Sequence, residues 1–197
     1  DDDKRVLRHA YLNSYFQTGL KNLIDIAVIN RAHEDNLDKI LTNYQKVDEI
    51  PFDFTRRRMS VVLQDKTGKR QLITKGAVEE MMEISAFIEI DGKVEVMNES
   101  LKELALKTYQ KHNQEGLRIL AVAQKNEVPD EHTFGVADES DLVLIGFIGF
   151  LDPPKESAKD ALFQLKEHGI RTIVLTGDSE GVTRKVCQKL NIEIGRA

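Results

Sequence analysis

The spacing of hydrophobic residues changes twice along the chain. In the first forty residues, apolar side chains recur every three or four positions, which predicts helices at 4–13 and 19–31. From about residue 46 the apolar residues alternate with polar ones or form short runs between turns, as strands and hairpins do. After residue 152 a helical pattern, an apolar segment and a second helical pattern follow one another, the order typical of a parallel α/β unit.

The middle of the chain therefore predicts mainly strands. The strand-like segments are 46–54, 59–65, 70–76, 87–97, 117–125 and 141–150, with helices expected at 77–85 and 99–116. Asp91-Gly92 is the strongest turn signal, and Gly116 is expected to end the longer helix. We expect an α+β fold over 1–150, an antiparallel sheet flanked by helical hairpins. An incomplete α/β segment of the haloacid-dehalogenase type is expected over 151–197.

Composition narrows the class of protein. The 197 residues are 41% hydrophobic and 31% charged, enough to bury a core in one or two domains. A net charge of -5 argues against a nucleic-acid partner, and a single cysteine, Cys187, excludes a disulfide within the chain. No apolar run approaches the ~20 residues of a membrane span, so we expect this stretch to be soluble even if its parent is not. The five histidines show no metal-ligand spacing, and we predict no structural zinc.

The string DKTGK at residues 65–69 differs by one residue from DKTGT, which carries the phosphorylated aspartate of P-type ATPases. Such an aspartate needs the end of a parallel strand and a crevice lined by amides and Mg²⁺ ligands. Asp65 instead lies between two strands close enough to form a hairpin, and Gly68 suits the positive φ of its turn. We predict that Asp65 is a turn residue and not a nucleophile.

Two aromatic residues, separated by one position, precede three consecutive arginines. Phe52 and Phe54 share a face if they lie on a strand, and rings next to arginines suit a purine and a polyphosphate. The alternative is that both rings belong to the core while the arginines solvate an edge strand. Lys75 is placed at a strand end beside Gly76, where it could contact a phosphate, flank a purine or remain solvated.

Five segments, in order along the chain, carry a resemblance to a known family. They are EIPFDFTRRRMSV (49–61), TKGAVEE (74–80), EGLRILAVA (115–123), LDPPK (151–155) and LTGD (175–178). Together they resemble the cytoplasmic ATP-binding part of P-type ATPases. The segment NSYFQTGLKNLIDIAVI is similar, more narrowly, to the bacterial magnesium-transporting branch.

The resemblance implies roles for individual residues. Phe52, or failing that Phe54, stacks on the adenine, and Lys75 and Gly76 line the ATP pocket. Arg56 and Arg118 are then phosphate ligands.

Further roles fall in the last third of the chain. Thr176 and Gly177 contact the transferred phosphoryl group, and Asp178 lies beside the nucleotide phosphates. Asp152-Pro153-Pro154 forms a stiff joint about which the ATP domain swings.

The chain departs from the family pattern in three respects. In family order the phosphorylated aspartate would precede residue 1, and the later Mg²⁺-binding element, of the GDGxND type, would follow Ala197. Many relatives carry a carboxylate in a TE string that accepts from the adenine amino group. Gly19 stands near that place here, with Gln17 or Asn22 as the alternatives.

Taken together, the resemblance implies a nucleotide-binding domain at 1–150 and part of a phosphorylation domain at 151–197. The parent would transfer the γ-phosphate of ATP, with Mg²⁺, to an aspartate at the cytoplasmic face of a membrane. The transfer would drive transport of a cation, Mg²⁺ first and Ca²⁺ as the alternative, with the rest of the polypeptide as partner. The fragment alone should bind ATP weakly and hydrolyse none. A phosphohydrolase of the haloacid-dehalogenase type would need a DxD or DxT nucleophile at an apolar strand end, and we expect none here. A non-enzymatic adaptor that docks an acidic partner on the arginine run stays open.

Overall fold

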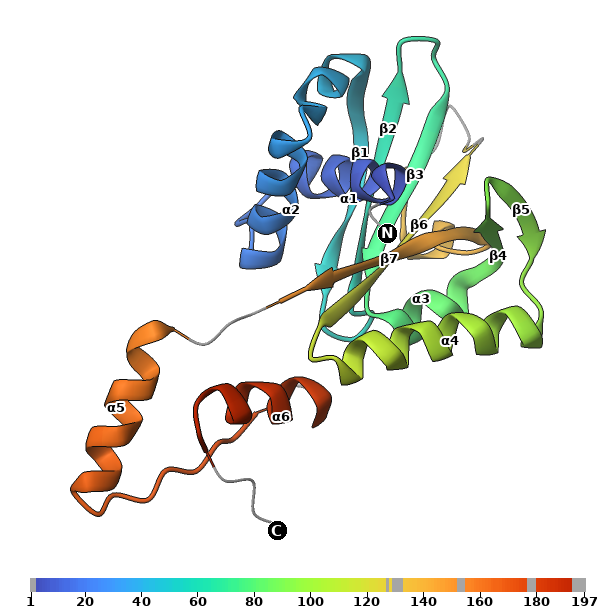
Figure 1. Ribbon diagram of the computed structural model, residues 1–197. Coiled ribbons are helices and arrows are strands. Elements are labelled where there is room, and N and C mark those ends of the chain that lie inside the picture. The colour runs from blue at the N-terminus through green and yellow to red at the C-terminus, as the bar shows by residue number, and fades with distance from the viewer. Residues whose placement is uncertain (1–2, 127, 129–132, 152–154, 177–179, 193–197) are drawn as a thin grey trace. The chain divides into compact units, whose positions relative to one another are not determined.

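The computed structural model describes residues 3–126, 128, 133–151, 155–176 and 180–192. The chain divides into two compact units (Figure 1). The larger unit comprises residues 1–104 and 120–148, and the smaller comprises 105–119 and 149–197.

A mixed sheet organises the larger unit. Its strands are β1 Tyr44–Asp53, β2 Arg58–Asp65, β3 Arg70–Gly76, β4 Ser85–Ile90, β5 Lys93–Val96, β6 Arg118–Asn126 and β7 Leu142–Phe150. Their order in the sheet is β1-β2-β3-β6-β7-β4-β5. The pairs β1–β2, β2–β3, β3–β6 and β4–β5 are antiparallel as expected, but β4 and β7 pair in parallel. The prediction of an antiparallel sheet was wrong at this pair. The chain between β4 and β7 contains a hairpin strand, a helix and β6, long enough to return in the same direction.

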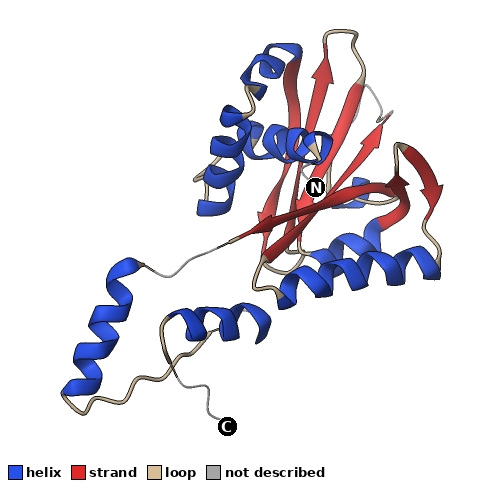
Figure 2. Cartoon of the chain, viewed as in Figure 1, coloured by secondary structure: helices blue, strands red, loops and turns tan. Residues whose placement is uncertain are grey.

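Helix α1 crosses β2 and β3, and α2 packs against α1 (Figure 2). The helical elements of this unit are α1 Lys4–Phe16, α2 Leu23–Glu34, α3 Val78–Ile84 and the 3₁₀ turns η1 Leu37–Asn43 and η2 Val136–Asp138. The predicted helices at 4–13 and 19–31 are confirmed, and α2 starts with a reciprocal capping box between Asn22 and Asp25. Leu12 of α1 packs with Val61 and Ile73 in a fully buried cluster. Burial of these aliphatic side chains holds the helix on the sheet.

The hairpin between β2 and β3 accounts for Asp65. Its Oδ1 accepts hydrogen bonds from the Thr67 amide (2.8 Å), the Thr67 hydroxyl (2.7 Å) and the Lys69 amide (3.1 Å). Gly68 has a φ of 88°. The prediction of a turn is confirmed, and Oδ1 of the Asp65 carboxylate closes that turn. The turn at Asp91-Gly92 is confirmed too, with φ values of 50° and 77°.

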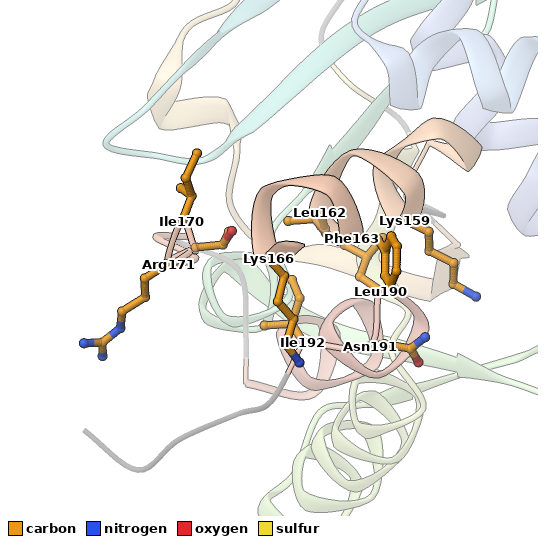
Figure 3. Close-up of a pocket in the computed structure, with 10 residues that line it drawn as sticks. Lys159, Leu162, Phe163, Lys166, Ile170, Arg171, Leu190, Asn191 and Ile192 are labelled. Atoms are coloured by element: carbon orange, nitrogen blue, oxygen red, sulfur yellow. The ribbon is translucent and has the colours of Figure 1, made fainter. Parts of the chain in front are cut away.

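The smaller unit is mostly helical. Helix α4, Glu99–Gln114, reaches into it from residue 105, and α5 Glu156–Glu167 and α6 Glu180–Lys189 complete it. Gly116 ends α4 with a φ of 86°, as predicted. A Cβ on Gly181 would meet the Asn113 carbonyl oxygen at 2.5 Å, so α6 approaches the end of α4 closely. A cavity of about 380 Å³ lies beside α5, with Leu162 and Phe163 on its wall (Figure 3).

The strand expected at 170–175 is not formed. None of the described residues from 151 to 192 is in a strand, and Ile173 and Leu175 are 68% and 91% exposed. A parallel strand exists only through hydrogen bonds to neighbouring strands, and the described part of this unit supplies no neighbour. Thr176 ends this segment, whereas Gly177, Asp178 and the Asp152-Pro153-Pro154 joint lie outside the described residues.

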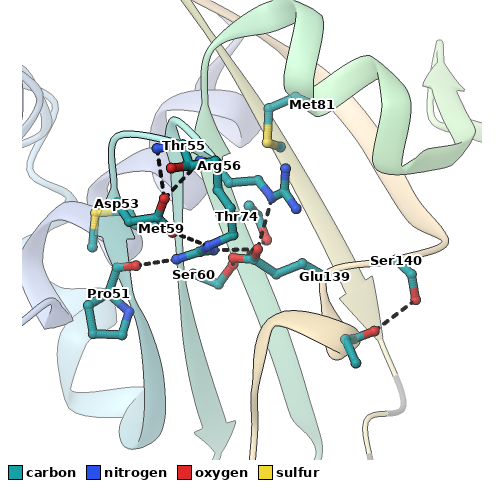
Figure 4. Close-up of polar contacts among 12 residues, drawn as sticks. Pro51, Asp53, Thr55, Arg56, Met59, Ser60, Thr74, Met81, Glu139 and Ser140 are labelled. Carbon is teal, nitrogen blue, oxygen red and sulfur yellow. Dashed lines mark hydrogen bonds and ion pairs between the residues drawn. The ribbon is translucent and has the colours of Figure 1, made fainter.

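One buried carboxylate, Glu139, joins the turn after β1 to the loop before β7 (Figure 4). Its side chain is fully buried, and Oε2 accepts from Arg56 Nη1 (2.6 Å) and Arg58 Nε (2.8 Å). Oε1 accepts from the Ser60 hydroxyl (2.6 Å), which shares a further hydrogen bond with Thr74 (2.8 Å). A buried charge is tolerated because it is paired and hydrogen-bonded, so removing one partner is strongly destabilising.

We expect Glu139→Gln to lower the free energy of unfolding by about 3–5 kcal/mol, because two guanidinium groups would lose their shared counterion. Urea denaturation of both proteins measures the difference. The matched control is Glu95→Gln on the exposed strand β5, with an expected change within about 0.5 kcal/mol. Equal, small changes in both variants would contradict a structural role for the network.

Candidate functional site

A cavity of about 610 Å³ opens on the larger unit beside β1 and the end of β3. Its walls come from the connection between α1 and α2, from β1 and the turn after it, and from β3 and the residue that follows it. Cavities of this size accommodate a small-molecule ligand. Three of the predicted site residues, Phe52, Lys75 and Gly76, line this cavity.

Two aromatic rings stand at this cavity. Phe52 is 50% exposed and Phe54 is 89% exposed, and the rings meet edge to face with 5.4 Å between centroids and 83° between planes. The alternative that both rings belong to the core is therefore wrong. Exposed aromatic rings on a cavity offer a flat apolar surface to a ligand.

Lys75 lies at the end of β3 and is buried. Its Nζ donates to Asp25 Oδ1 at 2.5 Å and to the Ser14 hydroxyl at 2.6 Å, and only 5% of the residue is exposed. Gln17 Nε2 donates to the other oxygen of Asp25 at 2.7 Å. Lys75 is thus not a solvated lysine beside a turn. It joins β3 to α1 and α2 at the wall of the cavity.

The two charges of this pair stabilise each other. Burial lowers the pKa of the Lys75 ammonium, while Asp25 acts in the opposite direction. Burial by itself raises the pKa of the Asp25 carboxyl, but Lys75 and hydrogen bonds from Gln17 and Ser14 outweigh it, so that pKa lies below its ordinary value. Asp25 is therefore ionised at neutral pH and balances the lysine.

Gly76 lines the same cavity and is required there by packing. A Cβ at this position would lie 2.4 Å from the Arg58 Cβ and 2.9 Å from the Arg57 carbonyl oxygen. The close approach that the glycine allows is to the start of β2.

Of the three consecutive arginines, only Arg57 lines the cavity. Arg56 contacts Glu139, Asp53 and the Pro51 carbonyl, and its side chain is 14% exposed. It is not among the residues that line the cavity, whereas Arg57 is. Arg57 has a φ of 49° and a side chain 56% exposed, paired with Glu80 at 2.7 Å. Sequence reasoning missed Arg57, because a run of arginines does not show which one a turn directs outward.

Two further predicted residues lie elsewhere in the described structure. Arg118 is the first residue of β6 and falls in the smaller unit. Thr176 also belongs to that unit. The structure thus brings together Phe52, Lys75 and Gly76 around one cavity.

Glu49 is a second residue that sequence reasoning missed. Its carboxylate lines the cavity and accepts from the Thr18 amide (2.8 Å), the Thr18 hydroxyl and Lys46 Nζ (2.7 Å). Burial raises the pKa of Glu49, but the hydrogen bonds from Lys46 and Thr18 outweigh this and hold it below its ordinary value. The cavity therefore contains an ionised carboxylate beside the loop that carries Gly19.

The positions of Glu49 and Phe52 could not be inferred from spacing. Residues three apart on a regular strand face opposite sides, yet both line this cavity. An irregularity in the β1–β2 register between Ile50 and Asp53 turns the strand between them. Gln17 and Asn22, the alternatives to a carboxylate at Gly19, are engaged with Asp25.

Comparison with known proteins places the chain in a class. A family model described as "P-type ATPase, cytoplasmic domain N" matches residues 15–157. The chain belongs to this family. Among the described residues no helix is long and apolar enough to cross a membrane, and no three potential ligands gather as a metal site.

The similar proteins are ion pumps by name. The chain is 44% identical to Magnesium-transporting ATPase, P-type 1 of Escherichia coli K12, over 98% of this chain and 21% of that protein. It is 42% identical to the same-named protein of Salmonella typhimurium LT2, with the same coverage. Calcium-transporting ATPase 2, endoplasmic reticulum-type, of Arabidopsis thaliana is 29% identical over 75% of this chain and 16% of that protein. The chain spans about a fifth of the length of the magnesium-transporting relatives.

We expect Asp25→Asn to lower the free energy of unfolding by about 3–5 kcal/mol at neutral pH, because Lys75 would be buried without a counterion. The folded-state pKa of Asp25 is lowered, so its contribution is present above the pKa of the unfolded chain. That contribution is lost as pH falls through the folded-state value. Urea denaturation at several pH values should show wild type and variant converging in acid.

Glu34→Gln on the exposed side of α2 serves as the control, with a small effect at every pH. A difference between wild type and Asp25→Asn that stays constant down to acid pH would contradict the ion pair as its source.

Proposed function

We propose that the cavity of the larger unit binds ATP, and that the chain is the nucleotide-binding part of a P-type ATPase that transports a cation, Mg²⁺ before Ca²⁺. The supporting observation is that exposed Phe52, cationic Arg57 and the end of β3 at Lys75 line one cavity in a chain of this family. The aromatic ring offers a stacking surface for a purine, and a guanidinium offers planar donors to a phosphate.

Within this proposal the chain positions the nucleotide. Phe52 contacts the base, and Arg57 takes the phosphate role that the sequence had suggested for Arg56. Arg56 is held by buried Glu139 and would have to break that pair to reach a ligand. Lys75 acts with its counterion Asp25 as part of the wall. Mg²⁺ would enter with the nucleotide and neutralise charge on its phosphates.

The chemical step lies largely beyond the described residues. In the whole protein the γ-phosphoryl group would move from ATP to an aspartate outside this chain, and ADP would leave. Thr176 and Gly177 are proposed to contact that group, Asp178 to lie beside the nucleotide phosphates, and Arg118 to contact those phosphates. We retain the division into a nucleotide-binding domain at 1–150 and part of a phosphorylation domain beyond it. The family match over residues 15–157 supports this division.

The remaining alternatives differ in their support. Transport of Mg²⁺ is favoured because the relatives named for magnesium are 38–44% identical, and those named for calcium are 29–30% identical. An adaptor that docks an acidic partner on the arginine run is disfavoured because Arg56 and Arg58 already share Glu139.

We expect Phe52→Ala to raise the Kd for ATP roughly tenfold or more, because base stacking on an aromatic ring contributes about 1–3 kcal/mol. Calorimetric titration of the 197-residue chain measures this. Phe54→Ala is the internal comparison and should have a smaller effect. Loss of affinity in Phe54→Ala alone would move the stacking role to Phe54, and unchanged affinity in both variants would refute the ATP site.

We expect Glu49→Gln to reduce the preference for ATP over GTP by roughly tenfold, since a carboxylate accepts from the amino group of adenine and repels the guanine oxygen at that position. Competition titrations of the two nucleotides measure the ratio. Glu83→Gln, exposed on α3, should leave the ratio unchanged. A ratio that does not move in Glu49→Gln would show that this carboxylate does not face the base.

A further inference from the structure

A second cavity of the larger unit, of about 840 Å³, has a different character from the first. The two cavities share no lining residue. The second lies beside the first turns of α1 and the β2–β3 hairpin, and four cationic side chains line it: Arg5 and Arg8 from α1, and Lys69 and Arg70 from the hairpin. Among the described residues that line it, Asp65 is the one carboxylate.

The positive charge of this cavity exceeds its negative charge, with four cationic side chains against the single carboxylate of Asp65 among the described lining residues. Asp65 Oδ1 is occupied by the Thr67 amide and hydroxyl and by the Lys69 amide. Arg5 has its own partner, Glu89, at 2.5 Å. The whole chain carries a net charge of -5, so a concentration of cations in one concave site is a local feature of the fold. Concave sites lined by one sign of charge concentrate ligands of the opposite sign.

Arg8 supplies the observation that points to a ligand. Its guanidinium lies over the Tyr44 ring, 5.7 Å from the centroid, and Nη2 contacts the Tyr44 hydroxyl. Arg8 Nε is buried and has no hydrogen-bond partner among the described residues. A buried donor on a cationic group without an acceptor is unfavourable, and a small movement of the Arg8 side chain toward an anionic oxygen in the cavity would satisfy it.

We propose that this cavity binds a small polyanion that carries phosphate groups. Guanidinium groups match phosphate oxygens in geometry, and Lys69 adds a point charge at the rim. The volume suits a small molecule. The DKTGK string then has a function other than phosphorylation, because the turn closed by Asp65 holds Lys69 and Arg70 at the cavity.

Inorganic tripolyphosphate is the probe, titrated into the 197-residue chain by calorimetry at about 0.15 M ionic strength, where weak surface attraction is screened. The double variant Lys69→Gln/Arg70→Gln should raise the Kd for tripolyphosphate about tenfold or more. The reason is that it removes charge-assisted hydrogen bonds to the phosphate oxygens. Lys69 lies in the hairpin turn and Arg70 is the first residue of β3, both away from the core, so the fold is expected to survive. Arg8→Gln is the second variant, checked for folding by circular dichroism.

The matched control is Lys93→Gln/Lys111→Gln. It also removes two positive charges, but from exposed positions outside the cavity. It should leave the Kd unchanged. An equal loss of affinity in the control and the hairpin variant would show attraction to net charge alone and overturn the proposal, as would no measurable binding.

Two further measurements distinguish tripolyphosphate binding in this cavity from binding in the ATP cavity. Arg57→Gln should leave tripolyphosphate affinity intact, and amide shifts on titration should appear at Thr67 and Gly68 rather than at Gly76 and Ala77. Shifts confined to Gly76 and Ala77 would assign the probe to the ATP cavity and overturn the second site. The outcome of the Phe52 experiment does not affect this result.

Discussion

The buried contact between Lys75 and Asp25 is the interaction on which the first cavity depends. Lys75 ends β3, Asp25 lies in the first turn of α2, and Ser14 of α1 hydrogen-bonds both. Neither charge is favourable in a buried position without the other. The pair therefore fixes where the α1–α2 connection lies against the sheet, and the space between that connection and β1 is the cavity.

A second buried charge decides which cations face outward. Glu139 draws Arg56 and Arg58 inward on either side of Arg57, and the left-handed backbone of Arg57 directs its side chain toward the cavity. Glu139 thus holds Arg56 and Arg58 in structural contacts. Arg57, which has the same side chain, is left facing the cavity.

The two cavities differ in how their charges are balanced. In the first, Lys75 has a buried counterion, and the exposed groups are aromatic rings, Arg57 and the carboxylate of Glu49, a mixture suited to a base joined to phosphates. In the second, four cationic side chains accompany one carboxylate among the described lining residues, and Oδ1 of that carboxylate is engaged in a turn. The same fold therefore presents two surfaces with different ligand chemistry.

Much of this was determined by the sequence alone. Hydrophobic periodicity and turn residues located the helices and the strands of the larger unit, and the DKTGK hairpin was recognisable from the strands around it. The order of motifs indicated the family, and Phe52, Lys75 and Gly76, which the resemblance assigned to one pocket, line one cavity. Those features depend on local patterns, which a single sequence contains.

What depended on contacts between distant segments was decided by the tertiary structure. Spacing could not reveal the irregularity in β1 that brings Glu49 beside Phe52, the choice between Arg56 and Arg57, or the parallel pairing of β4 with β7. The segment at 170–175 has the composition of a strand but no neighbour among the described residues to pair with. A strand, a buried charge and a cavity each require partners from elsewhere in the chain, and their positions follow from the packing of the whole unit.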